Sequence, residues 1–165
     1  MKSSTHQNIR ISVGYIKQLV EPVEPGQMAA MPKSQDGIAL NPPAWVIGHL
    51  AVSMAHVVKM LGGTVDLPQQ WSTLFDMKSQ PTDEASAYPD KAELLRGLDS
   101  VSESLCAALE ATTDEQLAAP TPREEFRKLV PTVGDAVTFV GVFHNGLHAG
   151  QLTSWRRCMG IGPRF

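Results

Sequence analysis

The sequence has few cysteines and no excess of positive charge, and each shortage excludes a class of protein. Two cysteines, Cys106 and Cys158, are too few for a disulfide framework and fit a reducing compartment. Lys and Arg number 14 against 17 Asp and Glu, which gives a net charge of −3. No basic stripe is present that could neutralise several phosphates, so we expect no nucleic-acid partner.

Segments that would address or anchor the chain to a membrane are also lacking. Residues 1–8 have no apolar core of the kind a signal peptide needs. Residues 42–61 are long enough to span a bilayer, but they carry two histidines, a serine and a lysine, so a buried helix is the better interpretation. We therefore expect a cytoplasmic protein that does not contact membranes. A chain of 165 residues is typical of a single domain, which we place at 1–165.

Helical periodicity dominates the sequence, and the alternation typical of strands is weak. Asn41, followed by two prolines, has the pattern of a helix N-cap, and the segments starting at Asp90 and Thr132 have the pattern of a capping box. We therefore predict an all-α fold, a bundle of four principal helices joined by long connections. The expected helices cover about 5–19, 42–61, 90–109 and 132–160, with a short helical turn within 69–75.

Three histidines form a candidate metal site. His144 and His148 are four residues apart, so on a helix they lie within ~40° of each other and can bind one ion from one face. His49, on another expected helix, could supply a third imidazole. Such a pair alone fits packing or surface positions equally well. Both histidines, however, replace apolar residues on a buried stripe, where an unbonded imidazole is unfavourable.

Three imidazoles without a fourth protein ligand describe a site with open positions, which suits catalysis better than a structural role. Imidazole-only ligation favours Zn²⁺ or Ni²⁺ over Mg²⁺ or Ca²⁺, which prefer oxygen. The sequence therefore predicts one divalent ion, Zn²⁺ or Ni²⁺.

Four other side chains are expected near this site. His56 shares a helix face with His49 but lies about 10 Å along the axis, too far to bind the same ion easily. We expect it to line a pocket or support a ligand, the alternative being a polar core residue. Gln151, three residues after His148, could orient a ligand or join two helices. Trp45 and Trp155 flank the site, with packing in the core as the first expectation and pocket lining as the second.

Two segments resemble a known family. Pro43–Leu50 has the pattern P-x-W-x-x-G-H-L, and His144–Arg157 has the pattern H-x-x-x-H-x-G-Q-L-x-x-W-R-R. Together they are similar to the DinB/YfiT-like superfamily, and the resemblance spans essentially the whole chain. It implies a four-helix bundle in an up-down-down-up arrangement, often a homodimer, with a divalent metal held by three histidines. Matched position by position, those ligands are His49, His144 and His148.

The resemblance also implies a class of activity. Characterised relatives include enzymes that use low-molecular-weight thiols such as bacillithiol or mycothiol, so we expect metal-dependent transfer of a small thiol to a small-molecule substrate. No Asp or Glu is obviously placed as a general base, and Asn145 stands where the H-E-x-x-H motif has glutamate. This mildly favours thiolate chemistry over hydrolysis. A metal-dependent hydrolase and a non-catalytic, stress-associated metal-binding dimer are the alternatives. A homodimer is also expected because the 42–61 helix is apolar on more faces than one bundle core needs.

Overall fold

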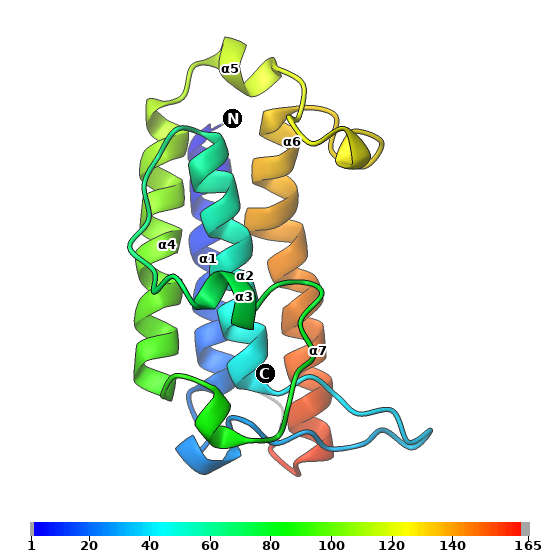
Figure 1. The fold of residues 1–165 in the computed structure, drawn as a ribbon. Helices are drawn as coiled ribbons and strands as arrows, with labels where there is room; N and C mark the ends of the chain where they lie inside the picture. The colour runs from blue at the N-terminus through cyan, green and yellow to red at the C-terminus, as the bar shows by residue number, and fades with distance from the viewer. Residues whose placement is uncertain (1, 163–165) are drawn as a thin grey trace.

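The computed structural model describes residues 2–162, which fold into a bundle of long helices (Figure 1). In chain order these are α1 (Lys2–Val20), α2 (Pro43–Met60), α4 (Lys91–Ala111) and a last helix built from α6 (Val133–Thr138), a π-helical turn (Phe139–His144) and α7 (Asn145–Cys158). Figure 1 shows α2 and α4 running in the same direction, with α1 and the last helix opposite to them. The predicted up-down-down-up bundle is therefore confirmed.

The connections contain only short elements. They are α3 (Trp71–Leu74), α5 (Asp114–Ala118) and the 3₁₀ turns Pro25–Gln27, Ala85–Ala87 and Glu124–Phe126. Within residues 2–162 no β-strand forms, and the only β contacts are two isolated bridges. The all-α prediction is confirmed, and α3 lies where a short turn was expected. None of the described helices combines the length and the hydropathy that crossing a bilayer would require.

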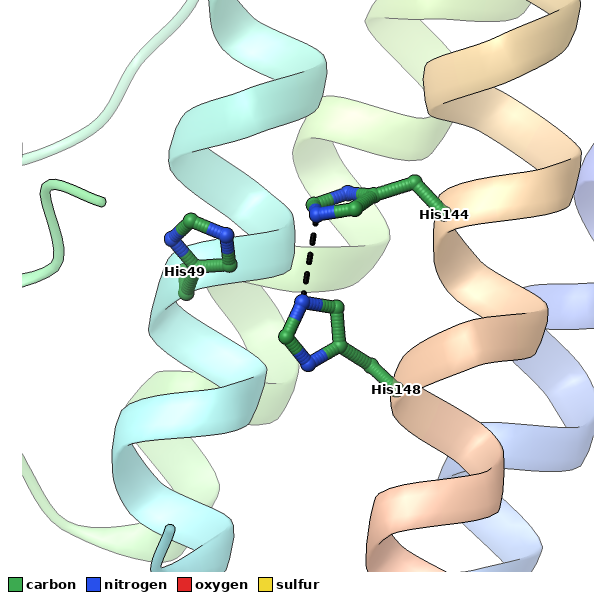
Figure 2. Close-up of side chains that lie close together, drawn as sticks. All are labelled: His49, His144 and His148. Carbon is green, nitrogen blue, oxygen red and sulfur yellow. Dashed lines mark hydrogen bonds between the residues drawn. The ribbon is translucent and has the colours of Figure 1, made fainter.

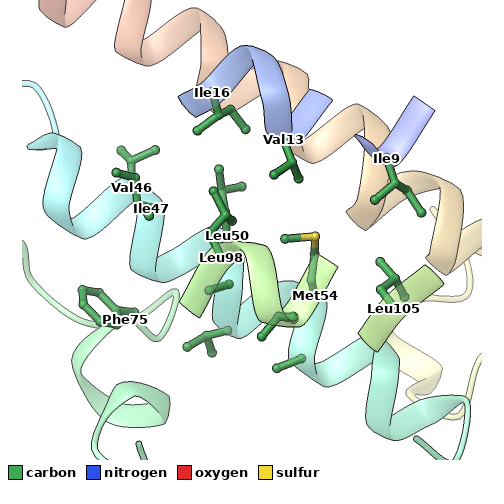
Figure 3. Close-up of a cluster of buried hydrophobic side chains, with 14 of the residues drawn as sticks. Ile9, Val13, Ile16, Val46, Ile47, Leu50, Met54, Phe75, Leu98 and Leu105 are labelled. Atoms are coloured by element: carbon green, nitrogen blue, oxygen red, sulfur yellow. The ribbon is translucent and has the colours of Figure 1, made fainter. Parts of the chain in front are cut away.

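The core is centred on α2. Fourteen of its 18 residues are buried, and Figure 3 shows its Ile47, Leu50 and Met54 among side chains from α1 and α4. Each large aliphatic side chain buried in this way contributes about 1.5–3 kcal/mol. The chain's own α4, α3 and last helix pack against α2, and α1 packs against α4 and the last helix. The apolar faces that suggested a dimer along this helix are therefore filled within one chain.

The ends of the helices follow local sequence signals, with two corrections. The Asp90 side chain accepts from the Glu93 amide at the start of α4, and Thr132 and Asp135 form a reciprocal capping box at the start of α6. At the start of α2 the capping position is Pro42, without a side-chain cap, so the predicted Asn41 cap is wrong. Pro42 is extended because the following proline disfavours helical geometry in the residue before it. The last helix ends at Cys158 rather than Gly160.

The π turn interrupts the last helix, so the inward face of this helix is not one continuous stripe. At Gly141 it approaches α1 so closely that a Cβ would lie 2.8 Å from Cγ1 of Ile9. The Gly141 carbonyl accepts hydrogen bonds from Ser12 Oγ (3.1 Å) and Asn145 Nδ2 (2.9 Å) within the π turn. A π turn alters the helical phase. Leu147, next to the buried His148, is 52% exposed, and Gln151 is exposed too.

Candidate metal centre

The three predicted histidines meet between α2 and the last helix. Figure 2 shows His49 on α2 facing His144 and His148 on the last helix. Their ring centroids are 4.6 to 5.1 Å apart, and one potential ligand atom of each lies within 4.8 Å of the others. His144 is the final residue of the π turn, so that turn sets how its ring meets His148.

His49 is held by a backbone carbonyl. Its Nδ1 donates to the Phe75 oxygen at 2.9 Å, which leaves Nε2 as the nitrogen available to a ligand. Gly48 makes this contact possible, because a Cβ there would overlap the buried Phe75 ring. Trp45 stacks on the other side of the imidazole, with centroids 4.6 Å apart and planes at 7°. The ring of His49 is therefore fixed from two directions.

The segment after α3 is tied to α2 beside this histidine. Trp45 Nε1 donates to Ser79 Oγ at 2.8 Å, and Ser79 Oγ donates to the Asp76 carbonyl at 2.7 Å. The Asp76 carboxylate accepts from the Lys78 amide at 2.8 Å. Trp45 thus packs against His49 and anchors the neighbouring segment. At 6% exposed it is a buried residue.

His148 is held by a side chain. Its Nδ1 donates to Gln151 Oε1 at 2.9 Å, and its Nε2 lies 3.1 Å from Nε2 of His144 (Figure 2). Metal-binding histidines generally donate their second ring N–H to a carbonyl or carboxylate oxygen, which fixes the tautomer and the ring. His49 and His148 both have that arrangement. The Nδ1 of His144 is buried and has no hydrogen-bond partner among the described residues.

Burial keeps all three imidazoles neutral near pH 7. It lowers the pKa of His148 to about 3, with further contributions from His144 and His49. It also lowers the pKa of His144 to about 4, with help from His49. The pKa of His49 is lowered by burial as well, although the hydrogen bond to Phe75 and the charge of Asp76 act against that shift. Neutral imidazoles are the form that binds metals.

The donor set fits a divalent ion. Ligand nitrogens about 2.0–2.1 Å from a tetrahedral Zn²⁺ would be separated by about 3.3 Å, close to the 3.1 Å between the Nε2 atoms of His144 and His148. His49 and His148 are each 7% exposed, whereas His144 is more open. The three histidines would therefore be able to hold one ion, with His144 as the ligand nearest to solvent.

The remaining expected residues separate into different roles. Gln151 contacts His148, as described above, and His56 lies exposed on α2 away from the three rings. Trp155 is fully buried and donates from Nε1 to the Ala30 carbonyl at 2.7 Å, so it is a core residue and does not line a pocket. A cavity of about 560 Å³ lies elsewhere, where the N-terminal end of α1 meets α6, with Lys2 and Thr138 in its lining.

Sequence reasoning missed the residues that position the histidines. Phe75 and Ser79 act through a carbonyl and a hydroxyl on an irregular segment, and no motif marks them. Gly48 directly before His49 was a usable signal of close approach. Asn145, which is completely buried and donates to Ser12 Oγ at 3.0 Å as well as to Gly141, was another, since an amide on an inward helix face needs partners.

The comparisons agree with this fold. The DinB superfamily matches residues 14–152. Among solved structures, YfiT from Bacillus subtilis is similar at a TM-score of 0.64 and 21% identity, over 98% of this chain and 89% of that one. YfiT is described as a probable metal-dependent hydrolase with an unusual four-helix bundle topology. No curated protein matches the sequence. Because the family match covers most of its length, the chain belongs to the DinB superfamily.

Proposed function

We propose that the protein binds one divalent metal ion, Zn²⁺ or Ni²⁺, through the Nε2 atoms of His49, His144 and His148. The observation that carries this proposal is the fixed orientation of the His49 and His148 rings. Because the Nδ1 atoms of His49 and His148 donate to carbonyl oxygens, their Nε2 lone pairs are directed toward the third histidine. Imidazole ligands suit either of these metals.

Metal analysis tests the site directly. Tag-free protein reconstituted with Zn²⁺ or Ni²⁺ should retain one ion per chain after desalting, and His148→Ala should retain far less. His56→Ala is the matched control, since it removes a histidine from the same bundle outside the cluster. Equal metal content in wild type and His148→Ala would remove His148 as a ligand.

We propose further that the protein is an enzyme that transfers a small thiol to an electrophile. A divalent ion at this site would supply positive charge that lowers the pKa of a thiol or water held beside it. The chain contributes neutral, immobilised imidazoles and aromatic surfaces from Trp45 and Phe139, whose ring centroid is 6.3 Å from that of His144. In the proposed transfer the thiol proton would pass to solvent, the sulfur would form a bond to the electrophilic carbon, and the bond from that carbon to the leaving group would break, its electron pair departing with the leaving group.

The position of the nearby carboxylate supports thiolate chemistry over hydrolysis. Asp76 follows Phe75, whose carbonyl contacts Nδ1 of His49, the nitrogen turned away from the other two histidines. The Asp76 carboxylate accepts a hydrogen bond from the Lys78 amide. Asp76 is therefore placed to support His49 rather than to remove a proton on the Nε2 side. A metal-dependent hydrolase is the second candidate, because the similar YfiT is described as a probable hydrolase of that kind.

A thiol screen separates these activities. Metal-loaded protein is assayed with a chromogenic electrophile and bacillithiol, mycothiol, glutathione or coenzyme A, with His144→Ala as the blank. We expect one thiol to give a rate well above the blank. Rates equal to the blank for every thiol, with the metal confirmed present, would end the transferase proposal. Thiol-independent turnover of an ester or amide would then favour the hydrolase, and no turnover a non-catalytic protein.

A further inference from the structure

The uncovered surface of α2 is a narrow strip that leads away from the histidine cluster. With 14 of its 18 residues buried, α2 leaves only four positions open, Ser53, His56, Lys59 and Met60. At 100° per residue, Ser53, His56 and Met60 lie within about 40° of the direction of His49 around the helix axis. Ser53, His56 and Met60 therefore continue the face of His49 from one turn beyond it, and Lys59 lies about 80° around the helix axis, at the edge of the strip.

The surroundings keep this strip open. In Figure 1, α3 lies in front of α2, the segment after it runs across toward the last helix, and no element crosses in front of the C-terminal half of α2 in this view. The π turn packs against α2 on the other side and presents Phe139 and Val140, both only partly buried. A molecule held at the histidines and extended along this face would therefore contact the apolar wall near the histidines and the polar strip farther along α2.

The strip carries positive charge. Within residues 2–162 the Lys59 ammonium and the His56 ring form no hydrogen bond or ion pair. Desolvation by neighbouring side chains lowers the pKa of His56, and the positive charges of Lys59 and Arg123 lower it further, against the opposing charge of Asp76. Arg123 is already paired with Glu125 at 3.0 Å. Lys59 therefore supplies the free charge, and His56 supplies a neutral hydrogen-bond donor.

We propose that this strip binds the far end of the substrate, and that this end carries an anionic group such as a carboxylate. The inference rests on the proposed function, because it takes the histidine cluster as the place where the other end is held. His56 lies about 10 Å along the helix from His49, which sets the distance between the two ends. An exposed lysine with a neighbouring donor stabilises an anion by about 1 kcal/mol, or about fivefold in affinity.

Thiols of graded length test this inference. Binding to Co²⁺-loaded protein is followed by the sulfur-to-cobalt absorption band, which requires no turnover. Mercaptooctanoate, long enough to span the distance, should bind about fivefold more tightly than mercaptooctanol, whereas mercaptopropionate and mercaptopropanol should differ little. Lys59→Gln and His56→Gln should each reduce the long-chain preference. Lys33→Gln, an exposed lysine in the loop before α2, should leave it unchanged.

The outcomes distinguish the two proposals. The anion-binding role of the strip would be refuted, with thiol binding still standing, by either of two results. One is that carboxylate thiols bind no more tightly than alcohol thiols at any chain length, and the other is that the preference for the carboxylate survives both Lys59→Gln and His56→Gln. If no thiol produces the absorption band, the thiol function fails instead. The same comparison is then made with suberic monohydroxamate and octanohydroxamate, whose metal-binding group is independent of thiols. Equal affinity of that pair would overturn the strip as well.

Discussion

At the scale of single residues, Gln151 is an exposed side chain that orients the buried His148, a proposed metal ligand. Its Oε1 accepts the Nδ1–H of His148, whose other nitrogen faces the cluster. We predict that Gln151→Ala weakens metal affinity by about 10–100-fold, because the partner that orients a ligand contributes to its affinity. Competition with a chromogenic chelator measures the change.

The control for this prediction is Ser154→Ala, one turn farther along α7 and equally exposed. Its hydroxyl donates only to the Gly150 carbonyl at 3.1 Å, so metal affinity should stay at the wild-type value. A Gln151→Ala protein that binds metal as tightly as Ser154→Ala would show that the hydrogen bond to His148 does not matter for the site.

The same histidines make the metal-free protein sensitive to acid. The pKa of His148 is about 3 in the folded protein, below its ordinary value near 6.5, so below about pH 6.5 the unfolded chain takes up a proton that the folded chain resists. The free energy of unfolding should therefore be constant above about pH 7. It should fall as the pH drops from about 6.5 toward 3, by at most about 1.4 kcal/mol per pH unit for this group.

Denaturant titrations of chelator-treated protein from pH 7.5 to 4.5 check this behaviour. His148→Leu should have a smaller slope with pH, since it removes one of the groups whose pKa differs between the folded and unfolded states. Identical slopes in the two proteins would mean that His148 titrates normally in the folded state.

At the scale of elements, Gly48 joins α2 to the segment after α3. A Cβ at this position would overlap the Phe75 ring, which is completely buried and cannot easily move aside. We predict that Gly48→Ala lowers the free energy of unfolding by about 1–3 kcal/mol and also weakens metal binding, since the Phe75 carbonyl holds His49. Denaturant unfolding and metal analysis of the same protein measure both effects.

Gly14→Ala is a matched control in α1. A Cβ there meets no atom within 4 Å, so alanine should stabilise the helix by up to about 1 kcal/mol and leave metal binding unchanged. If both alanine variants stabilised the protein, the close packing of Phe75 on Gly48 would be refuted.

At the scale of the whole molecule, the expected homodimer stays a prediction, but its original reason no longer holds because α2 is covered within one chain. The outward apolar residues of the last helix are Phe143 and Leu147, 57% and 52% exposed and one turn apart. We expect a mass twice the 17.9 kDa of one chain in light scattering, and a shift toward monomer in Leu147→Glu. A monomer mass for wild type at micromolar concentration would rule the dimer out.

Features that depend on neighbouring residues were predictable from the sequence. The helical periodicity of Leu94–Leu109 and the caps at Asp90 and Thr132 are local signals, because capping bonds join residues three apart. The histidine cluster was predictable as well. The spacing of His144 and His148 places them on one face, His49 on another expected helix was the candidate third imidazole, and the resemblance to the DinB superfamily matched all three to ligand positions.

Other features depended on contacts between residues far apart in the chain, and only the tertiary structure decided them. The π turn forms where Gly141 meets Ile9 and Ser12 of α1, and it turns Leu147 outward. Phe75 reaches His49 because its ring packs on Gly48. The sequence by itself therefore determined the helices and the three histidines. Packing between α1, α2 and the last helix determined how those histidines are oriented and which face of α2 stays open, because orientation and exposure depend on which distant side chains fill the space beside each residue.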